Sequence, residues 1–399
     1  MGKVLKKWWW TVLVFAMFLG AVASTVWYWP QPLVSPLIST DSFQLLFGDR
    51  QKHTPKIVYG FLPYWNVDKA TVQPELTHLA YFGANISANG KLGKDADGNR
   101  DIGVSRMSSD LTQELIAKTA QQHKPVQLVL TQMTNGDIES FLANPSAHQQ
   151  LIRDLDQMAT TFPISGVNID IEYVGDATPA MRQQLVTFVK TLNQHLKATS
   201  PKMALSIDVY AGAVKNQQIW DIAALEPYID HFIVMAYDFH RPSSIYAGPV
   251  APIFGGKTKW QSDVITHMQE FVKVVPTKKL LLGVPFYGYE WQTTSAASLA
   301  SVYPGSGSTA SFRRVQELLS RKDELQIQER WDEEALAPYL LYMENKKQYV
   351  VYFENSRSLS YKLDLANQLD LGGIAIWALG YEDNSRELWD AIHQKFFTQ

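Results

Sequence analysis

The chain contains no cysteine among its 399 residues. Disulfide bridges, thiol catalysis and thiolate metal sites are therefore excluded. Histidine is scarce as well, and the nine His residues show no close pairing at the spacing of metal ligands. We therefore expect neither a structural nor a catalytic metal, and no cofactor.

The sequence also lacks a basic run, and its formal net charge is only -3. A nucleic-acid partner is therefore not expected. Apolar residues make up 46% of the chain and aromatic residues 12%. The apolar content suffices for one large core or two domains. The aromatic content suits surfaces that stack on sugars, although cores use aromatic side chains too.

Charge is absent from residues 8–29, which would span about 33 Å as a helix, enough to cross a bilayer. Lys3, Lys6 and Lys7 precede this segment and would keep the N-terminus inside the cell. We expect 1–29 to be an uncleaved membrane anchor. The alternative is a signal peptide with Ala21-Val22-Ala23 as its cleavage site. Either way the following domain lies outside the cytoplasm, joined by a proline-containing linker over 30–55.

From residue 56 onward, predicted strands alternate with predicted helices. Eight short apolar runs are typical of strands: Lys56–Phe61, Leu76–Phe82, Val126–Leu130, Ser165–Tyr173, Met203–Val209, His231–Tyr237, Lys279–Pro285 and Gly372–Ala378. The intervening helices are expected at Ser109–Gln122, Ala147–Thr161, Pro179–Lys197, Gln217–Leu225, Trp260–Val274, Ser356–Leu369 and Ser385–Phe396. This alternation predicts an α/β fold, a (β/α)8 TIM barrel over 56–398.

The seventh unit of this barrel is too long for one helix and a loop. It contains a helical segment, Arg313–Lys322, and two strands, Tyr339–Met343 and Gln348–Phe353, spaced as a hairpin. We therefore expect a small α+β insertion over about 292–352.

The fourth predicted strand carries an unusual polar face. Alternation places Asn168, Asp170 and Glu172 on one side and apolar residues on the other. Three polar groups on one face are costly to bury unless that face lines a polar cavity. A barrel strand whose C-terminal end opens into an active site provides one. The alternative is a half-exposed antiparallel strand with a solvated polar face.

This strand resembles the D-G-x-D-x-D-x-E signature of glycoside hydrolase family 18, the chitinase family. Gly166, Asp170 and Glu172 match it, whereas Ser165 and Asn168 each replace an Asp. Further matches lie at Met235-Ala236-Tyr237-Asp238 for the family's M-x-Y-D pattern, at Trp377 for the Trp of the last strand, and at Gly60-Phe61 for an aromatic residue ending the first strand. The resemblance covers roughly 56–398. The run 349–380 looks most like bacterial members that attack cell-wall sugars, including spore-cortex N-acetylglucosaminidases.

The resemblance implies substrate-assisted retaining hydrolysis of β-1,4 bonds next to N-acetylglucosamine, in chitin-type oligosaccharides or peptidoglycan. It implies Glu172 as the general acid and base, Asp170 as the partner of the acetamido N–H, and Tyr237 as a donor to the acetamido oxygen. The implied substrate-binding residues are Asp238, Trp377, Met235, Phe61 and Asn168.

Several points stay open on the sequence. Strict alternation puts Asp238 opposite Tyr237, so both can face one site only if the strand's pleat breaks there. Asp208 has an even chance of facing the cavity, and His240 is expected to make loop hydrogen bonds. Aromatic side chains at 287, 289 and 291 could stack on substrate or seal the insertion against the barrel.

Asn168 stands where an Asp of the family shares a proton with the residue corresponding to Asp170. We therefore expect a shifted pH optimum. The main alternative to an enzyme is a non-catalytic, lectin-like sugar-binding barrel at the cell envelope. We expect a monomer whose partners are an N-acetylglucosamine-containing glycan and, through the N-terminal helix, the membrane.

Overall fold

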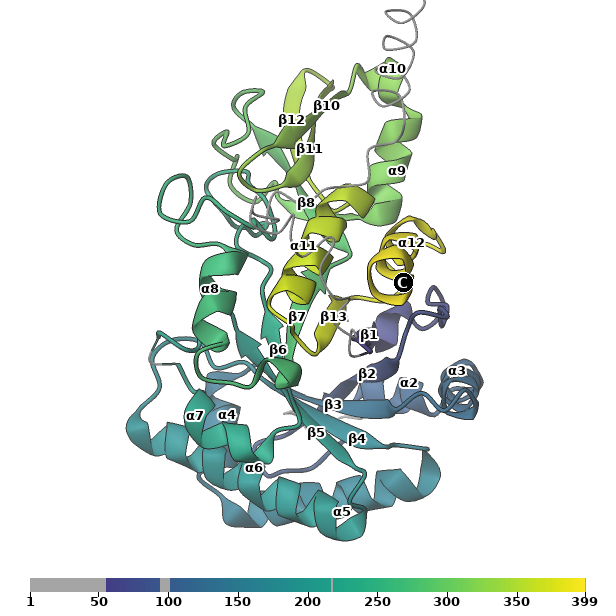
Figure 1. Ribbon diagram of the computed structural model, residues 1–399, viewed down its shortest axis with the longest axis vertical. Coiled ribbons are helices and arrows are strands. Elements are labelled where there is room, and N and C mark those ends of the chain that lie inside the picture. The colour runs from purple at the N-terminus through teal and green to yellow at the C-terminus, as the bar shows by residue number, and fades with distance from the viewer. Residues whose placement is uncertain (1–54, 94–100, 217, 399) are drawn as a thin grey trace, which may run out of the picture. The chain divides into compact units, whose positions relative to one another are not determined.

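The computed structural model describes residues 55–93, 101–216 and 218–398. Eight parallel strands close into a barrel in the order β1-β13-β7-β6-β5-β4-β3-β2 (Figure 1). Their bounds are β1 Ile57–Pro63, β2 His78–Asn85, β3 Val126–Gln132, β4 Gly166–Ile171, β5 Ala204–Tyr210, β6 His231–Met235, β7 Leu280–Pro285 and β13 Gly373–Trp377. The predicted (β/α)8 barrel is confirmed.

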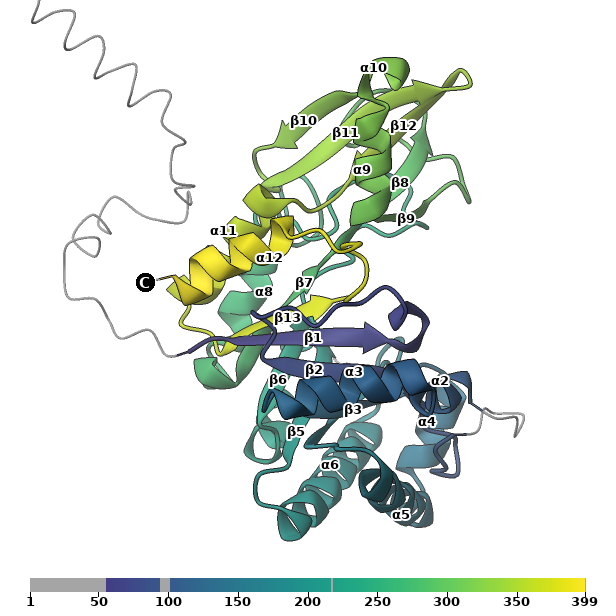
Figure 2. The ribbon, with the colours of Figure 1, turned by 90° about the vertical axis from the view of Figure 1, so that its right-hand side faces the viewer.

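Helices cover the outside of this barrel, with α5 and α6 beside β3 to β5 and α11 and α12 beside β13 and β1 (Figure 2). The helices of the barrel are α2 Ile102–Met107, α3 Asp110–Gln121, α4 Asn135–Leu142, α5 Pro145–Thr161, α6 Pro179–Thr199, α7 Ile222–Leu225, α8 Val264–Phe271, α11 Ser356–Gln368 and α12 Glu387–Ile392. Short 3-10 turns lie at Tyr64–Asn66, Glu226–Tyr228 and Thr277–Lys279, and a π-helical turn at His393–Phe397 follows α12.

Sequence signals at the helix starts explain where the long helices begin. The side chain of Asn144 accepts from the backbone N–H groups of Ser146 and Ala147 at the start of α5, and Thr178 does the same for Met181 in α6. A proline follows each cap, which suits a position whose N–H has no partner inside the helix.

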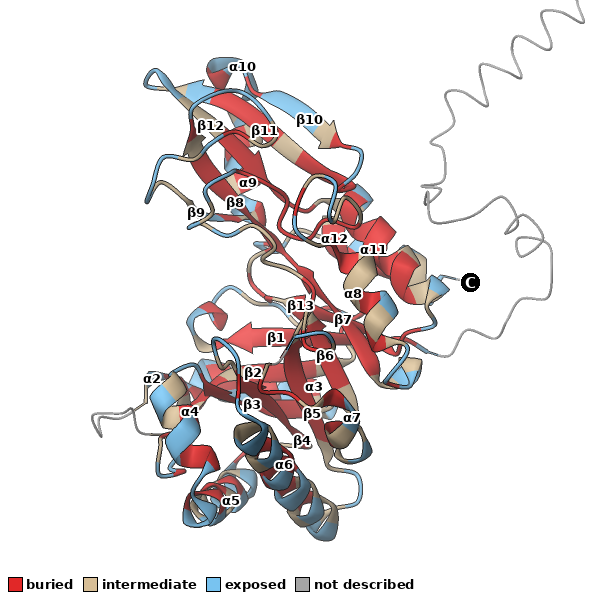
Figure 3. Cartoon of the chain, turned by 90° about the vertical axis from the view of Figure 1, so that its left-hand side faces the viewer, coloured by how far each residue is buried: buried red, intermediate tan, exposed pale blue. Residues whose placement is uncertain are grey.

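Side chains fill the interior of the barrel beneath the C-terminal ends of its strands. Inward-facing side chains of six strands form one apolar cluster: Tyr59, Phe61, Ala80, Val129, Ile233, Leu281 and Ala375. The strands themselves are almost wholly buried, whereas the helices expose their outer faces (Figure 3). The barrel is therefore a filled core that leaves its C-terminal strand ends for a site.

A second sheet lies in the chain between β7 and β13. It has the order β10-β11-β12-β8-β9 and is antiparallel at every pairing. Its strands are β8 Tyr287–Thr293, β9 Ser308–Ser311, β10 Gln328–Asp332, β11 Ala337–Glu344 and β12 Lys347–Tyr352, with helices α9 Phe312–Ser320 and α10 Lys322–Leu325. Figure 1 shows this sheet above the barrel, at the end where β7 leads into β8.

Several predicted boundaries differ from the structure. The second sheet begins at Tyr287, earlier than the expected 292, because β8 follows β7 after a single residue. The helix expected at Trp260–Val274 is limited to α8, which Asp263 caps by accepting from Thr266 N at 2.9 Å. The helix expected at Gln217–Leu225 is reduced to α7, and the short helices α2 and α4 were not predicted.

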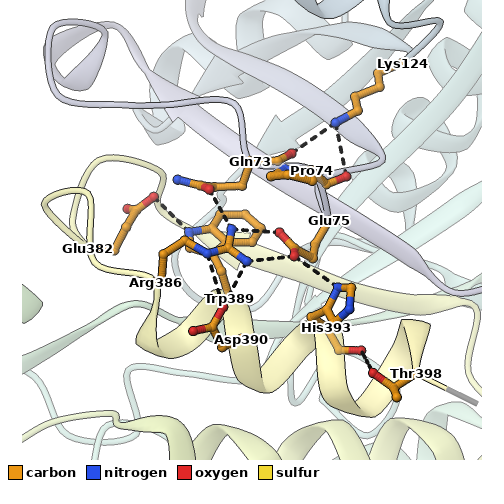
Figure 4. A network of polar contacts seen from close by, with 10 residues as sticks. All are labelled: Gln73, Pro74, Glu75, Lys124, Glu382, Arg386, Trp389, Asp390, His393 and Thr398. Carbon is orange, nitrogen blue, oxygen red and sulfur yellow. Dashed lines mark hydrogen bonds and ion pairs between the residues drawn. The ribbon is translucent and has the colours of Figure 1, made fainter.

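A buried carboxylate joins the end of the chain to the barrel (Figure 4). Glu75, in the β1–β2 connection, accepts two hydrogen bonds from Arg386 at 2.8 and 3.0 Å. The ring of His393 lies 3.2 Å from the same carboxylate, and Arg386 also donates to Gln73 at 2.7 Å. These contacts fasten α12 and the turn after it to the start of the barrel.

The predicted anchor and linker, 1–29 and 30–55, lie outside the described residues apart from Pro55. Among the helices that the structure describes, none combines the length and apolarity needed to cross a bilayer.

Candidate active site

A cavity of about 290 Å³ opens at the C-terminal ends of the barrel strands. Its lining side chains come from six of the eight barrel strands or the residues after them, and from the second sheet: Phe82, Met133, Asp170, Glu172, Asp208, Tyr210, Met235, Tyr237, Asp238, Arg241, Tyr287, Tyr289, Thr309, Trp377 and Tyr381. Six of the eight residues predicted for the site are among them. Phe61 and Asn168 are not.

The polar face of β4 is arranged as alternation requires. Asn168 is fully buried below the cavity, Asp170 lies above it with 4% of its surface exposed, and Glu172 follows the end of the strand at the rim. Asn168 donates to Ser206 Oγ at 3.0 Å and to Asp208 Oδ1 at 2.9 Å. It therefore acts on neighbouring polar groups rather than on the cavity itself.

Glu172 has the environment of a proton donor. Burial raises the pKa of its carboxyl, and nearby Asp238 raises it further. A hydrogen bond from the Tyr210 hydroxyl and the charge of Arg241 act in the opposite direction without reversing the shift. A carboxylic acid with a raised pKa can hold its proton toward neutral pH and deliver it to a leaving group.

Asp170 and Asp208 face the same cavity, which resolves the orientation that the sequence left open for Asp208. Burial raises the pKa of both carboxyls. Asp208 and Glu172 raise that of Asp170 further, while the bond from Asn168 lowers that of Asp208. The cavity floor thus holds several carboxyl groups that cannot all be ionised at low cost.

Tyr237 and Asp238 both reach the cavity because β6 ends at Met235. Asp238 has φ of 61°, a left-handed conformation that interrupts the alternation of the strand. The break in the pleat that the sequence required is therefore present. Gly283 on β7 makes room for the Tyr237 ring, because a Cβ there would lie 2.9 Å from Tyr237 Cε1.

The second sheet completes the site by holding Asp238. Tyr287 and Tyr289, both on β8, donate their hydroxyls to Asp238 Oδ1, the latter at 2.8 Å. Trp291, the next inward residue of β8, is fully buried and donates to Arg241 O at 3.1 Å. The sequence left two interpretations open for these aromatic residues. Tyr287 and Tyr289 line the cavity, whereas Trp291 is buried between the second sheet and the loop after β6.

Trp377 forms an aromatic wall. Its ring centroid lies 5.6 Å from that of Phe61 and 4.9 Å from that of Phe82. Phe61 is buried at 1% exposure and supports the Trp377 ring from behind instead of lining the cavity. The Nδ1–H of His240 donates to Pro249 O at 2.8 Å, so the expectation of a loop hydrogen bond is confirmed.

A larger cleft of about 1120 Å³ continues from this cavity. The two share the side chains of Tyr210, Met235, Tyr237, Asp238 and Arg241. Beyond them the cleft runs along the long β6–α8 connection, past Ile245 and Tyr246, which are 73% and 48% exposed. The cleft therefore offers room for a ligand that extends outward from the cavity.

Sequence reasoning missed Tyr210, Arg241 and Tyr381. The first could have been found, since it lies two residues after Asp208 on β5 and shares its face. The other two lie in loops after their strands, where no periodic signal exists.

The family model for glycosyl hydrolases family 18 matches residues 56–382. The chain belongs to this family. It is accordingly a glycosidase, as predicted from the motifs of the fourth, sixth and last barrel strands. The predicted resemblance is thereby confirmed.

Individual relatives are more distant. The protein named "Probable di-N-acetylchitobiase 2" of Dictyostelium discoideum is 28% identical over 288 residues, covering 65% of this chain and 72% of the relative. The "Cortical fragment-lytic enzyme" of Bacillus anthracis is 24% identical over 325 residues, covering 77% of this chain and 66% of the relative. The chitinase structure from Chromobacterium violaceum superposes with a TM-score of 0.68 at 23% identity, covering 86% of this chain and 100% of that one.

Proposed function

We propose that this glycosidase hydrolyses β-1,4 bonds next to N-acetylglucosamine by substrate-assisted retaining catalysis, with Glu172 as general acid and base. The observation that carries the proposal is the Glu172 carboxyl, whose pKa is raised by burial, at the rim of a cavity that also holds Asp170. Retaining hydrolysis that uses the substrate's own acetamido group needs one acid and one group to orient the acetamide. These two residues supply both.

The acetamido group would bind between β4 and the end of β6. Its N–H would donate to Asp170, and its carbonyl oxygen would accept from the Tyr237 hydroxyl before attacking the anomeric carbon. Glu172 would protonate the leaving oxygen and then remove a proton from the incoming water. Asp170 would also stabilise the positive charge that develops on the acetamido group.

The remaining residues would shape the pocket around one sugar ring. Trp377 would form its apolar floor, with Phe61 holding the indole from behind, and Met235 would line the side. Asp238, fixed by two tyrosine hydroxyls, would accept from polar hydrogens of the sugar. Asn168 would act indirectly, through its bond to Asp208.

The substrate would be a glycan of the chitin or peptidoglycan type. The relatives named for chitobiose and for cortical fragments share this N-acetylglucosamine chemistry. The cleft that adjoins the cavity offers room for further rings on one side of the cleaved bond. A lectin-like barrel is less well supported, because a purely binding site has no use for a carboxyl with a raised pKa at the rim.

The decisive experiment is hydrolysis by the full-length chain, solubilised in detergent, of chitooligosaccharides and of purified peptidoglycan, with products analysed by mass. Glu172→Gln, which keeps the shape and removes the acid, should reduce turnover by about 100-fold or more. Glu114→Gln, on the exposed face of α3, is the matched control and should be unaffected. Glycan binding without turnover, unchanged by Glu172→Gln, would establish the lectin-like alternative.

We also propose that residues 1–29 hold the enzyme at the outer side of the membrane as a monomer, with 30–55 as the tether. The uncharged run of residues 8–29 supports this proposal. Cell fractionation and light scattering test it. Recovery of a shortened chain in the medium would indicate a cleaved signal peptide instead.

A further inference from the structure

Asp170 and Asp208 lie side by side on neighbouring strands. The parallel register of β4 and β5 pairs Asn168 with Ser206 and Ile169 with Ile207. The next position along the register brings the two aspartates together, both pointing into the barrel. Both side chains line the cavity, with only 4% and 3% of their residue surface exposed.

Their hydrogen-bond partners are unequal. Asp208 Oδ1 accepts from the Asn168 amide at 2.9 Å. Asp170 Oδ1 is buried and has no hydrogen-bond partner among the residues that the structure describes. A buried carboxylate oxygen without a donor is costly, whereas a protonated one can itself donate.

Arg241 lines the same cavity, but its ion pair is with Asp238 and not with either aspartate of this pair. The groups that face the pair are the carboxyl of Glu172 from the end of β4 and three tyrosines: Tyr59 of β1, Tyr210 of β5 and Tyr237 after β6. Among the described residues, no lysine, arginine or histidine forms an ion pair with either aspartate. Two full negative charges, buried on neighbouring strands, would repel strongly.

We infer that Asp170 and Asp208 share a single proton, and that Asp208 is a positioning residue that sets the charge of Asp170 during catalysis. The Asn168 bond stabilises negative charge on Asp208, so the proton rests on Asp170 in the free enzyme. The orphan oxygen of Asp170 would then carry a proton that it can donate.

This inference rests on the proposed function for its catalytic part. When the acetamido N–H arrives, Asp170 must accept a hydrogen bond. The proton then moves from an Asp170 oxygen to an Asp208 oxygen, so that the O–H bond breaks on one carboxyl and forms on the other. No electron leaves the pair and its total charge stays constant. Asp170 is left negative beside the developing positive charge of the acetamido group.

Infrared difference spectroscopy at neutral pH tests the shared proton without any turnover. All proteins carry Glu172→Gln, so that the proton of Glu172 does not contribute. The parent protein carries Glu172→Gln alone, and the variant carries Asp208→Asn as well. The parent spectrum minus the variant spectrum should show one C=O band of a protonated carboxyl group. Adding Asp170→Asn instead should remove the same single band, because one proton needs both carboxyls. Asp323→Asn, on the exposed surface of α10, should remove none.

Two spectroscopic results would overturn the inference. Loss of the band with only one of the two substitutions would assign the proton to a single residue. Absence of a band from both difference spectra would show that the pair holds no proton. Neither result depends on whether the protein hydrolyses a glycan, so failure of the proposed function and failure of the shared proton are distinguishable.

Kinetics test the positioning role by exchanging the side chains of positions 168 and 208, so that the carboxyl moves from β5 to β4. Asp208→Asn should lower kcat at least about tenfold with little change in KM, since the residue acts through Asp170. Adding Asn168→Asp to that variant returns a carboxyl beside Asp170, from β4 instead of β5, and should restore most of kcat. A purely structural role for Asp208 predicts no rescue, and that outcome would refute the positioning role.

Discussion

Arg241 places a positive charge at the cavity that holds Glu172. It lines both the cavity and the adjoining cleft, and its side chain is 60% exposed. Its Nε donates to Asp238 O at 3.3 Å and lies 3.9 Å from Asp238 Oδ2. The planar guanidinium suits a carboxylate ligand, which peptidoglycan carries on its muramic acid and chitin lacks.

Replacing Arg241 should therefore separate the two candidate substrates. We expect Arg241→Gln to raise KM for peptidoglycan fragments by roughly 10- to 100-fold, the loss of a hydrogen bond between charged groups. KM for chitooligosaccharides should stay nearly constant. The measurement is steady-state kinetics on both substrates, with Lys273→Gln, an exposed cation after α8, as control. Equal losses on both substrates would contradict recognition of a carboxylate.

The same substitution has a pH signature. Arg241 lowers the pKa of Glu172, in opposition to burial, which raises it. Removing the guanidinium should therefore raise the pKa further, so that Glu172 stays protonated to a higher pH. The alkaline limb of kcat should move upward on either substrate. An alkaline limb that stays in place would show that another group controls it.

Asp238 shows how one element of the second sheet serves the barrel. The carboxylate extends from a left-handed residue after β6, and β8 supplies both hydroxyls that hold it. These two bonds fix its direction toward the cavity. The second sheet therefore contributes directly to the geometry of the cavity.

Removal of both hydroxyls tests this role of β8. Tyr287→Phe/Tyr289→Phe leaves the rings in place and should reduce kcat/KM by roughly 10- to 100-fold, because Asp238 loses two charge-assisted bonds. Tyr339→Phe is the matched control, since the hydroxyl of Tyr339 on β11 makes no hydrogen bond to a described residue. If the double variant is as active as this control, the two hydrogen bonds to Asp238 are not needed for sugar binding.

The barrel strands were predictable because each is a short apolar run in regular alternation with helices. The two-residue period placed Asp170 and Glu172 on one face of their strand, and the family resemblance favoured the inward direction of that face. Strand β8 was missed although its aromatic residues alternate with Gly288, Glu290 and Gln292, because it begins one residue after β7 and no turn signal separates the two strands. Gly283 was equally hidden, because a missing side chain signals nothing until the ring of Tyr237 is placed against it.

At the scale of the whole molecule, closure of the barrel depends on residues far apart in the sequence. Figure 4 shows Arg386 between the carboxylates of Glu75 and Asp390. These contacts join the β1–β2 connection to α12, and so hold the first and last parts of the barrel domain together. Loops between neighbouring strands cannot provide this, because they join only adjacent parts of the chain.

Arg386→Gln should lower the free energy of unfolding by about 2 kcal/mol at neutral pH, because the buried Glu75 loses its two charged hydrogen bonds. The network lowers the pKa of Glu75 below its usual 4.5, although burial alone would raise it. Its contribution is therefore complete above that value and is lost as the pH falls through the lower, folded-state pKa.

The difference in unfolding free energy between the native chain and Arg386→Gln should accordingly be largest at neutral pH and shrink as the pH falls below 4.5. Urea titrations followed by tryptophan fluorescence across this range measure it. Lys322→Gln breaks an ion pair with Glu329 in which both side chains are 52% exposed, and should change stability little at any pH. A difference for Arg386→Gln that is independent of pH would mean that the arginine stabilises by packing rather than by binding the Glu75 carboxylate.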